Sequence, residues 1–193
     1  YIGSLSQILV EFKASGFYYL FHKSPYDLRN KLSEVSNFVS KELYNNLETD
    51  LIKNDNPDNQ VKNIEQFLLE LSYKALPFVE YIEEGIKLID KHFGNITVSE
   101  IVAKVGRSKR QFDRKFHEVV GVSPKYYAKI VQLYHVLNII CSKNYSSIQE
   151  LAFKGEFYDL PHFVNAFKKL TGFTPNEFIN SDKHIALKYF NEK

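Results

Sequence analysis

The sequence predicts an all-α protein. Its second half repeats one two-helix unit, with a long helix joining the two copies, and its first half holds a short strand remnant and a helical linker. Three observations predict this fold: apolar residues at helical spacing along most of the chain, capping-box sequences before short helices, and the return of that pattern about 50 residues later. The chain has 193 residues, which is enough for one large domain or two small ones.

Residues 1–76 are predicted to be the end of a separate domain followed by a helical linker. Residues 5–12, LSQILVEF, have the composition of a strand. Helical spacing predicts helices at 26–32 and 34–48, and the sequence NDNPDN at 54–59 predicts a loop. A further amphipathic helix is predicted by an apolar stripe made of Val61, Ile64, Leu68 and Leu71.

The next helix is predicted to begin at Pro77 and to end at Gly94. Proline is favoured in the first turn of a helix, and glycine is favoured just beyond the last turn. The predicted buried side consists of Ile82, Ile86, Ile89 and Phe93.

Two short helices follow, separated by a glycine turn. The pairs Thr97–Glu100 and Ser108–Gln111 both have the spacing of a capping box, which marks the start of a helix. Gly106 ends the first helix after about two and a half turns, too few for stability without packing. Two short helices joined by a turn of this length form a helix-turn-helix.

The second short helix, residues 109–119, has one apolar side and one charged side. Its buried residues are predicted to be Phe112, Phe116 and Val119, and it ends at Gly121. Helical spacing then places the remaining side chains toward solvent: Arg110, Asp113, Arg114 and His117, with Lys109 at the start.

The two-helix pattern returns after a long helix that Ser123 is predicted to cap and that runs from Pro124 to about Ser142. At an offset of 51, Phe112, Phe116, Gly121, Ser123, Pro124 and Tyr127 match Phe163, Phe167, Gly172, Thr174, Pro175 and Phe178. At an offset of 50, Thr97, Glu100 and Val102 match Ser147, Glu150 and Ala152. Buried positions, caps and stops recur together, which indicates a duplicated structural unit with one residue inserted between the helices of the second copy.

The positive charge of the chain is concentrated in one stretch. The net charge is +2, but residues 104–115 hold six Lys and Arg against one Asp. Such a local basic patch is typical of a nucleic-acid contact surface, although a charge run also occurs on ordinary solvated helix faces.

Other classes of site lack their sequence signatures. Cys141 is the one cysteine, which excludes a disulfide within the chain, and it is predicted to be a buried small hydrophobe. The six His lack metal-ligand spacing, and no phosphate loop, nucleophile elbow or carboxylate pair is found. We therefore expect no catalytic residue, cofactor or metal, no membrane span, and a non-enzymatic protein of the cytoplasm.

The repeated segments resemble the C-terminal DNA-binding domain of AraC/XylS-type transcriptional regulators. The matching text is VSEIVAKVGRSKRQFDRKFHEVVGVSPKYY and SIQELAFKGEFYDLPHFVNAFKKLTGFTPNEF. The resemblance implies a tandem helix-turn-helix domain at 77–180, a C-terminal tail at 181–193 and the remnant of a sensory domain within 1–76. It implies double-stranded DNA as partner, and it makes RNA polymerase, a small-molecule effector acting through the missing N-terminal domain, and a second copy of the chain candidate partners. Transcriptional activation is the expected role.

The resemblance also assigns roles to individual residues. The positions that would contact base edges are Lys109, Arg110, Asp113 and Arg114. The positions that would contact phosphates or support the interface are Lys104, Arg107, Ser108, Lys115, His162, Asn165, Lys168 and Lys169. Arginine can bond guanine O6 and N7 together, aspartate can accept from cytosine N4, and clustered cations gain affinity by releasing counterions.

The second repeat departs from the family pattern. Glu156 stands where glycine is usual in the turn, and Asn165 stands where arginine is common. Gln132, in the joining helix, also replaces a common arginine. The second helix begins with Leu160 and Pro161, which offer no side-chain donor to a base. We therefore expect the second repeat to dock on DNA while the first repeat supplies most base contacts.

Alternative interpretations remain at three points. The basic face could bind an acidic protein partner instead of DNA, and an active site could lie in the missing N-terminal part. The aromatic cluster Phe12, Phe17, Tyr18, Tyr19 and Phe21 could be core, a contact with an absent barrel, or a ligand cage. The stripe that begins at Val61 could pair two chains or simply pack against residues 34–48.

Overall fold

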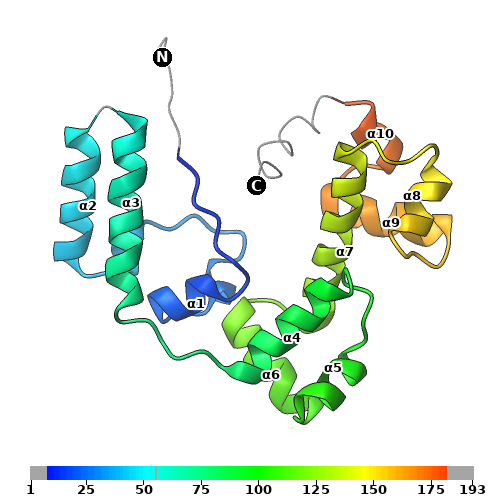
Figure 1. Ribbon diagram of the computed structural model, residues 1–193, viewed down its shortest axis with the longest axis horizontal. Coiled ribbons are helices and arrows are strands. Elements are labelled where there is room, and N and C mark those ends of the chain that lie inside the picture. The colour runs from blue at the N-terminus through cyan, green and yellow to red at the C-terminus, as the bar shows by residue number, and fades with distance from the viewer. Residues whose placement is uncertain (1–7, 55, 182–193) are drawn as a thin grey trace. The chain divides into compact units, whose positions relative to one another are not determined.

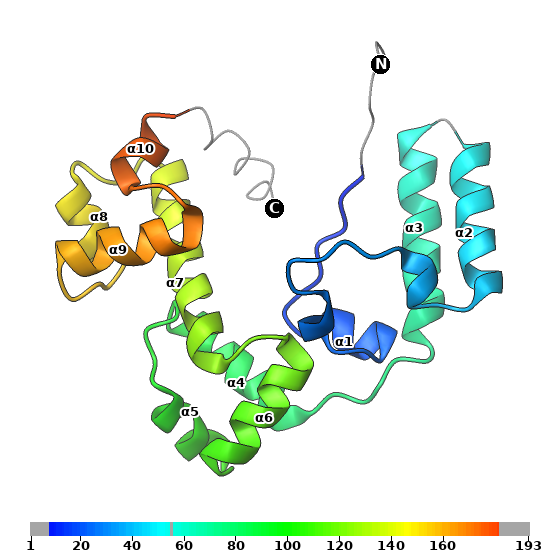
Figure 2. The same cartoon turned by 180° about the vertical axis from the view of Figure 1, so that it is seen from behind.

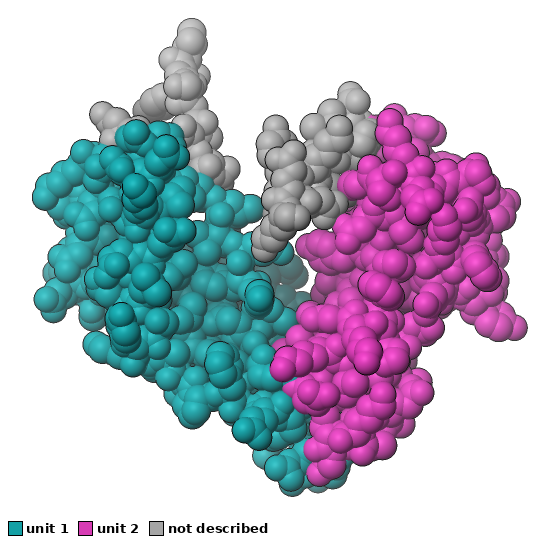
Figure 3. Space-filling view, in the orientation of Figure 1, with its two compact units in different colours: residues 1–83, 107–123 teal, residues 84–106, 124–193 magenta. Residues whose placement is uncertain are grey.

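The structure is a computed structural model, and it describes residues 8–54 and 56–181. Within these residues the chain is helical and has no strand, which confirms the all-α prediction. It divides into two compact units: unit 1 is residues 1–83 with 107–123, and unit 2 is residues 84–106 with 124–193 (Figure 3). No helix in the described part is long and apolar enough to cross a membrane.

Unit 1 contains a pair of helices and a short helix that packs beside it. α2 (Lys41–Lys53) and α3 (Pro57–Ser72) lie side by side, and α1 (Gly16–Phe21) contacts α3 (Figures 1 and 2). Two short 3-10 helices, η1 (Pro25–Leu28) and η2 (Val35–Asn37), connect α1 to α2. The linker region of the sequence is thus a helical layer of its own.

Several boundaries in this region differ from the sequence prediction. Residues 8–12 form no strand, and 5–7 lie outside the described residues; an isolated strand has no neighbour to complete its hydrogen bonds. The predicted helices at 26–32 and 34–48 are reduced to η1, η2 and α2. α2 begins after Ser40, whose extended backbone and hydroxyl, accepting from the Leu43 N–H at 3.3 Å, form the N-cap.

The next two helices also begin at different residues from those expected. Asn56 caps α3 by accepting from the Asp58 N–H at 2.8 Å, so the helix starts inside the predicted loop. α4 (Glu80–Lys91) begins three residues after Pro77. Its apolar side is buried as predicted at Ile82, Ile86 and Ile89, but Phe93 is 48% exposed because α4 has already ended and Phe93 has a positive φ of 48°.

The helix α6 (Lys109–Val120) completes unit 1. Ser108 and Gln111 form the predicted capping box, and the predicted residues Phe112, Phe116 and Val119 are buried. The helix ends at Gly121, whose φ of 82° is left-handed. α6 contacts both η1 and α1, which the sequence did not reveal.

Unit 2 holds α5 (Val98–Val105), α7 (Pro124–Cys141), α8 (Ile148–Lys154), α9 (Leu160–Thr171) and α10 (Pro175–Ile179). The capping box at Thr97 and the stop at Gly106 form as predicted. α8 and α9 pack on α7. Their shared core consists of Val136, Leu137, Ile140, Leu151, Ala152, Phe163, Phe167 and Phe178.

The caps locate the insertion in the second repeat. Ser108 and Asp159 cap α6 and α9 and are 51 residues apart, whereas the left-handed residues Gly106 and Glu156 are 50 apart. The turn before α9 is therefore one residue longer, and Phe157 in that turn packs on Phe163 with ring centroids 5.0 Å apart. The domain boundary at 76/77 stays a prediction, and the tail beyond 181 lies outside the described residues.

Candidate nucleic-acid interface

The exposed side of α6 carries unpaired positive charge. Lys109, Arg110 and Arg114 are exposed, and Asp113 is half-buried between them. Within the described part of the chain, none of the three cations forms an ion pair with a carboxylate. Arg110 and Arg114 are four residues apart, so they lie one turn apart on the same side, where like charges repel.

The position of these cations within α6 is also electrostatically unfavourable. The N-terminal end of a helix carries partial positive charge, so each cation in the first turn costs about 0.3–1 kcal/mol at low ionic strength. The first turn of α6 holds Lys109 and Arg110 and no acidic residue. Six of the other α-helices in the described residues carry an acid in that turn, namely Glu42, Asp58, Glu80, Glu100, Glu150 and Glu177, whereas α1, α7 and α9 carry none. A helix end that collects cations against its own dipole is suited to an anionic partner.

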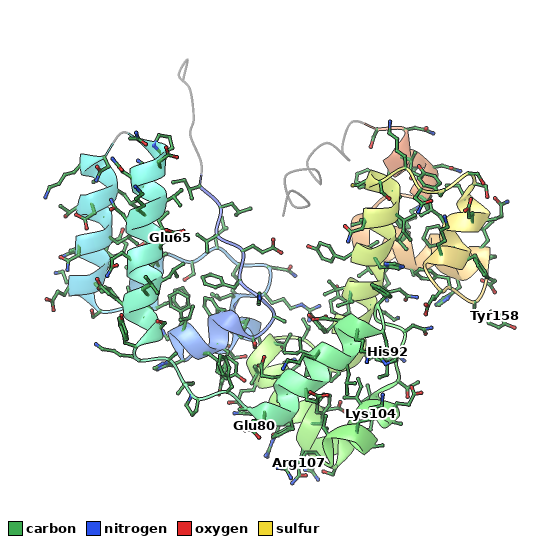
Figure 4. The ribbon with its side chains drawn as sticks, viewed as in Figure 1. Glu65, Glu80, His92, Lys104, Arg107 and Tyr158 are labelled. Atoms are coloured by element: carbon green, nitrogen blue, oxygen red, sulfur yellow. The ribbon has the colours of Figure 1, made fainter. Side chains whose placement is uncertain are left out.

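The flanking residues with predicted supporting roles are held in different ways. The Ser108 hydroxyl caps α6, accepting from the Gln111 N–H at 3.3 Å and donating to Gln111 Oε1 at 2.9 Å. The Arg107 guanidinium lies over the Tyr81 ring, 5.1 Å from its centroid. Lys104, in the last turn of α5, and Arg107 both extend away from the ribbon (Figure 4). Of these predicted phosphate-contacting residues, Lys104 and Arg107 have side chains exposed to solvent, whereas the Ser108 hydroxyl is already hydrogen-bonded in the N-cap of α6.

Lys115 is engaged within the protein. Its ammonium donates to Glu118 Oε1 at 2.8 Å and to the Tyr18 hydroxyl at 3.2 Å, and Tyr18 donates to the same Glu118 oxygen at 2.6 Å. The hydrogen bond from Lys115, followed by that from Tyr18, lowers the pKa of Glu118, and burial raises the pKa of Tyr18. Lys115 is thus tied to α1 through a residue 97 positions away.

His117 does not face solvent as the helical spacing predicted. It is half-buried, and its ring centroid lies 4.5 Å from that of Tyr26 in η1. The prediction was wrong because η1 covers this side of α6, a contact between segments some 90 residues apart that periodicity within α6 does not reveal. The Lys115–Glu118 spacing was visible in the sequence, but nothing there indicated Tyr18 or Tyr26.

The corresponding helix of the second repeat presents a different surface. His162, Asn165, Lys168 and Lys169 are exposed on α9, as predicted. The N-cap of α9 is Asp159, whose carboxylate accepts from the His162 N–H at 2.7 Å. A carboxylate therefore occupies the end of α9 that corresponds to the cationic end of α6. The two lysines lie in the last turn, where the helix dipole itself favours positive charge.

The residues that depart from the family pattern, Gln132 and Glu156, make contacts within the protein. Gln132 Nε2 donates to the Gly155 carbonyl at 2.8 Å and so ties the turn to α7. Glu156 adopts a positive φ of 57° and accepts a hydrogen bond from the Asn95 amide. Tyr158, in the same turn, is 94% exposed and extends away from the ribbon (Figure 4). Glu156 and Gln132 thus stabilise the longer turn.

A comparison with known families identifies the repeated part of the chain. Residues 101–181 match a family model described as a helix-turn-helix domain. These residues are a helix-turn-helix domain. The match runs from α5 to α10, so it covers both repeats, and it confirms for this part of the chain the resemblance to AraC/XylS-type regulators.

Solved structures of similar proteins were also found. One is a transcriptional regulator with an AraC-type DNA-binding domain from Chromobacterium violaceum: 21% identity, 53% of this chain and 95% of that chain covered, TM-score 0.47. Another is a probable AraC family transcriptional regulator from Rhodopseudomonas palustris CGA009: 24% identity, 52% and 94% covered, TM-score 0.46. No curated protein matches the chain.

Among residues 8–54 and 56–181, no group of three or more His, Cys, Asp and Glu residues is arranged to hold a metal ion. Cys141, predicted to be a buried small hydrophobe, is half-buried at the end of α7. The chemistry that the interface offers is charge and hydrogen bonding.

Proposed function

We propose that the chain is a sequence-specific, double-stranded DNA-binding regulator of transcription in which α6 makes most of the contacts to bases. The observation that carries this proposal is the pair of exposed arginines, Arg110 and Arg114, on a capped helix whose first turn holds cations and no acid. A helix that faces only solvent gains nothing from that arrangement, whereas the negative charge of a DNA backbone offsets the electrostatic repulsion among its cations.

The side chains on α6 offer two kinds of contact. Arg110 and Arg114 have planar guanidinium groups that can bond guanine O6 and N7 in the major groove, and Asp113 can accept from cytosine N4. Lys109, Lys104 and Arg107 supply charge near the backbone, where counterion release gives affinity without sequence preference. The division between base and phosphate contacts is part of the proposal.

The second repeat is proposed to bind mainly the DNA backbone. α9 begins with Leu160 and Pro161 behind the carboxylate of Asp159, and its cations, Lys168 and Lys169, are at the opposite end. A carboxylate at the helix N-terminus repels phosphates that would otherwise be bound there. We therefore expect α9 to add little base preference, with His162 and Asn165 supporting its contact with the backbone.

Selection of bound duplexes from a random pool by the intact chain tests the proposal. Sequence-specific binding predicts enrichment of a motif, and an acidic protein partner as the true ligand predicts none. The matched variants are Arg114→Ala on α6 and Asn165→Ala on α9, at positions 51 residues apart in the two repeats. Circular dichroism spectra must show that both variants remain folded.

The two variants are expected to change DNA binding in different ways, one in sequence preference and the other in overall affinity. Loss of a bidentate arginine contact costs about 1–3 kcal/mol and relaxes preference at one base pair, so Arg114→Ala should change the selected motif at one or two positions. Asn165→Ala should weaken binding to all sequences almost equally. A larger change of motif in Asn165→Ala would show that α6 is not the principal source of base contacts.

A further inference from the structure

An apolar cavity lies in unit 1, bounded by α1, α2, α3 and the segment around η1 and η2. Its volume is about 460 Å³, within the range of about 300–1,000 Å³ that is usual for small-molecule sites. Thirteen of its fifteen lining residues are apolar, and the two polar ones are Lys31 and Ser33. The lining suits a ligand that is apolar over most of its surface.

Of the five phenylalanine rings that line this cavity, four contact one another. Phe17 lies 4.7 Å from Phe21 and 5.5 Å from Phe38, and Phe12 lies 6.0 Å from Phe17, measured between ring centroids. Such rings offer both faces and edges to an aromatic guest. Lys31, the ionisable residue of the lining, is exposed, so an acidic group on the ligand could bind there while the apolar body stays inside.

The helix α1 connects this cavity to α6. Phe17 and Phe21 are four residues apart and therefore share one side of α1, and both line the cavity. Tyr18 lies on another side of the same six-residue helix, where its hydroxyl donates to Glu118 at 2.6 Å and accepts from Lys115 at 3.2 Å. A displacement of α1 by a ligand must therefore alter the contacts of Lys115.

We propose that this cavity binds an apolar small molecule, preferably one with a single acidic group, and that α1 transmits its occupancy to α6. A ligand that presses on Phe17 and Phe21 displaces Tyr18, and Lys115 then keeps only its bond to Glu118 within α6, so it exchanges more readily to a DNA phosphate. Bound ligand therefore raises the affinity for DNA, and by thermodynamic reciprocity DNA raises the affinity for the ligand by the same factor. The effect on DNA rests on the proposed function, whereas the binding of a ligand does not.

Two fluorescent probes with the same ring system test the cavity on the intact chain. N-phenyl-1-naphthylamine is neutral, and 8-anilinonaphthalene-1-sulfonate adds one sulfonate. Both should bind to the native protein with increased fluorescence, and Lys31→Gln should weaken the sulfonate probe alone. Leu47→Phe and Leu68→Phe narrow the cavity from two different helices, and each should weaken both probes at least about tenfold.

The control for cavity filling is Ile52→Phe. Ile52 is on α2 beside the lining residue Leu51, but it is 74% exposed and does not line the cavity. This variant should bind both probes as the wild type does. No probe binding by the native wild type, or unchanged binding in both filled variants, overturns the cavity as a ligand site.

The coupling to α6 is tested by measuring DNA affinity with and without saturating sulfonate probe. We expect an increase of about fivefold or more, the lower end of usual allosteric couplings. Tyr18→Phe removes only the hydroxyl, so it should leave probe binding intact and abolish the increase. Tyr44→Phe, which removes a hydroxyl bonded to Glu48 on the surface of α2, should retain it. Probe binding with no change in DNA affinity overturns the coupling, whereas probe binding without any DNA binding contradicts the proposed function alone.

Discussion

Replacing Arg110 by glutamate should make the protein more stable and less able to bind DNA. Arg110 lies in the first turn of α6, where the helix dipole disfavours a cation, and one turn before Arg114, where like charges repel. Arg110→Glu replaces both unfavourable interactions with favourable ones. A residue retained against local stability is expected where function requires it.

The size of the effect follows from these two interactions. The dipole contributes about 0.3–1 kcal/mol for each charge, and each i,i+3 or i,i+4 charge pair contributes about 0.2–0.5 kcal/mol. The pair gained with Arg114 is offset by the pair lost with Asp113, three residues from Arg110, so reversal of the charge at the dipole leaves a gain of about 1 kcal/mol. For a chain of 150–250 residues this raises Tm by about 2–4 °C. DNA affinity should fall at least about tenfold, because a bidentate contact worth about 1–3 kcal/mol is lost and phosphate repulsion is added.

Thermal melting at low and high salt, together with DNA titration, measures both effects. The gain in Tm should shrink as salt screens the charges. The matched control is Lys104→Glu, the same kind of charge reversal in the last turn of α5, where the dipole favours a cation and Glu100 lies one turn before it. That variant should melt at a lower temperature. A lower Tm for Arg110→Glu with DNA binding preserved would refute the reasoning.

Three further predictions concern the glycine stops, the acid dependence of stability and the salt dependence of binding. Gly121→Ala should lower the free energy of unfolding more than the control Gly172→Ala, which has only the roughly 1–2 kcal/mol of left-handed strain. A Cβ at Gly121 would lie 2.8 Å from the Tyr26 backbone nitrogen, whereas a Cβ at Gly172 meets nothing within 4 Å. Equal losses of stability in urea titrations would contradict this. Hydrogen bonds from Ser146 and then Lys154 lower the pKa of Glu150 to about 2. Ionised Glu150 should therefore stabilise the fold at pH values above 4.5, its ordinary pKa, and lose that effect as the pH falls toward about 2. Glu150→Gln should make the midpoint of urea unfolding depend less on pH over this window, and an unchanged pH profile would count against the prediction. Lys168→Ala should reduce the slope of log affinity against log salt by about one without altering the preferred sequence, and an altered sequence in duplex selection would sink that assignment.

Local signals explain the parts of the fold that the sequence predicted correctly. The capping boxes at Thr97 and Ser108 and the left-handed stops at Gly106 and Gly121 involve residues three to five positions apart. Such interactions form wherever the helix forms, so their sequence signature is reliable. The repeat predicted the second helix-turn-helix for the same reason, since its caps and buried phenylalanines recur at a fixed offset.

The charged side of α6 was also predictable, because a helix with three buried apolar residues places the others outward. What the sequence did not predict was which of those outward residues another segment would cover. His117 has the same periodicity as the exposed residues, yet Tyr26 contacts it from 91 positions away, and Tyr18 reaches Lys115 from 97 positions away. Distant contacts have no periodic signature, so only the tertiary structure reveals them.

The sequence by itself determined the helical repeats, their caps and the concentration of positive charge, because each depends on interactions within one or two turns. The tertiary structure decided where the linker helices begin, that residues 8–12 form no strand, and that α1 contacts both an apolar cavity and α6. These features depend on which surfaces are brought together when the chain packs. The free energy of that packing comes from burying apolar side chains such as Phe21 and Phe67, which lie 46 residues apart in the sequence and line the same cavity in the fold.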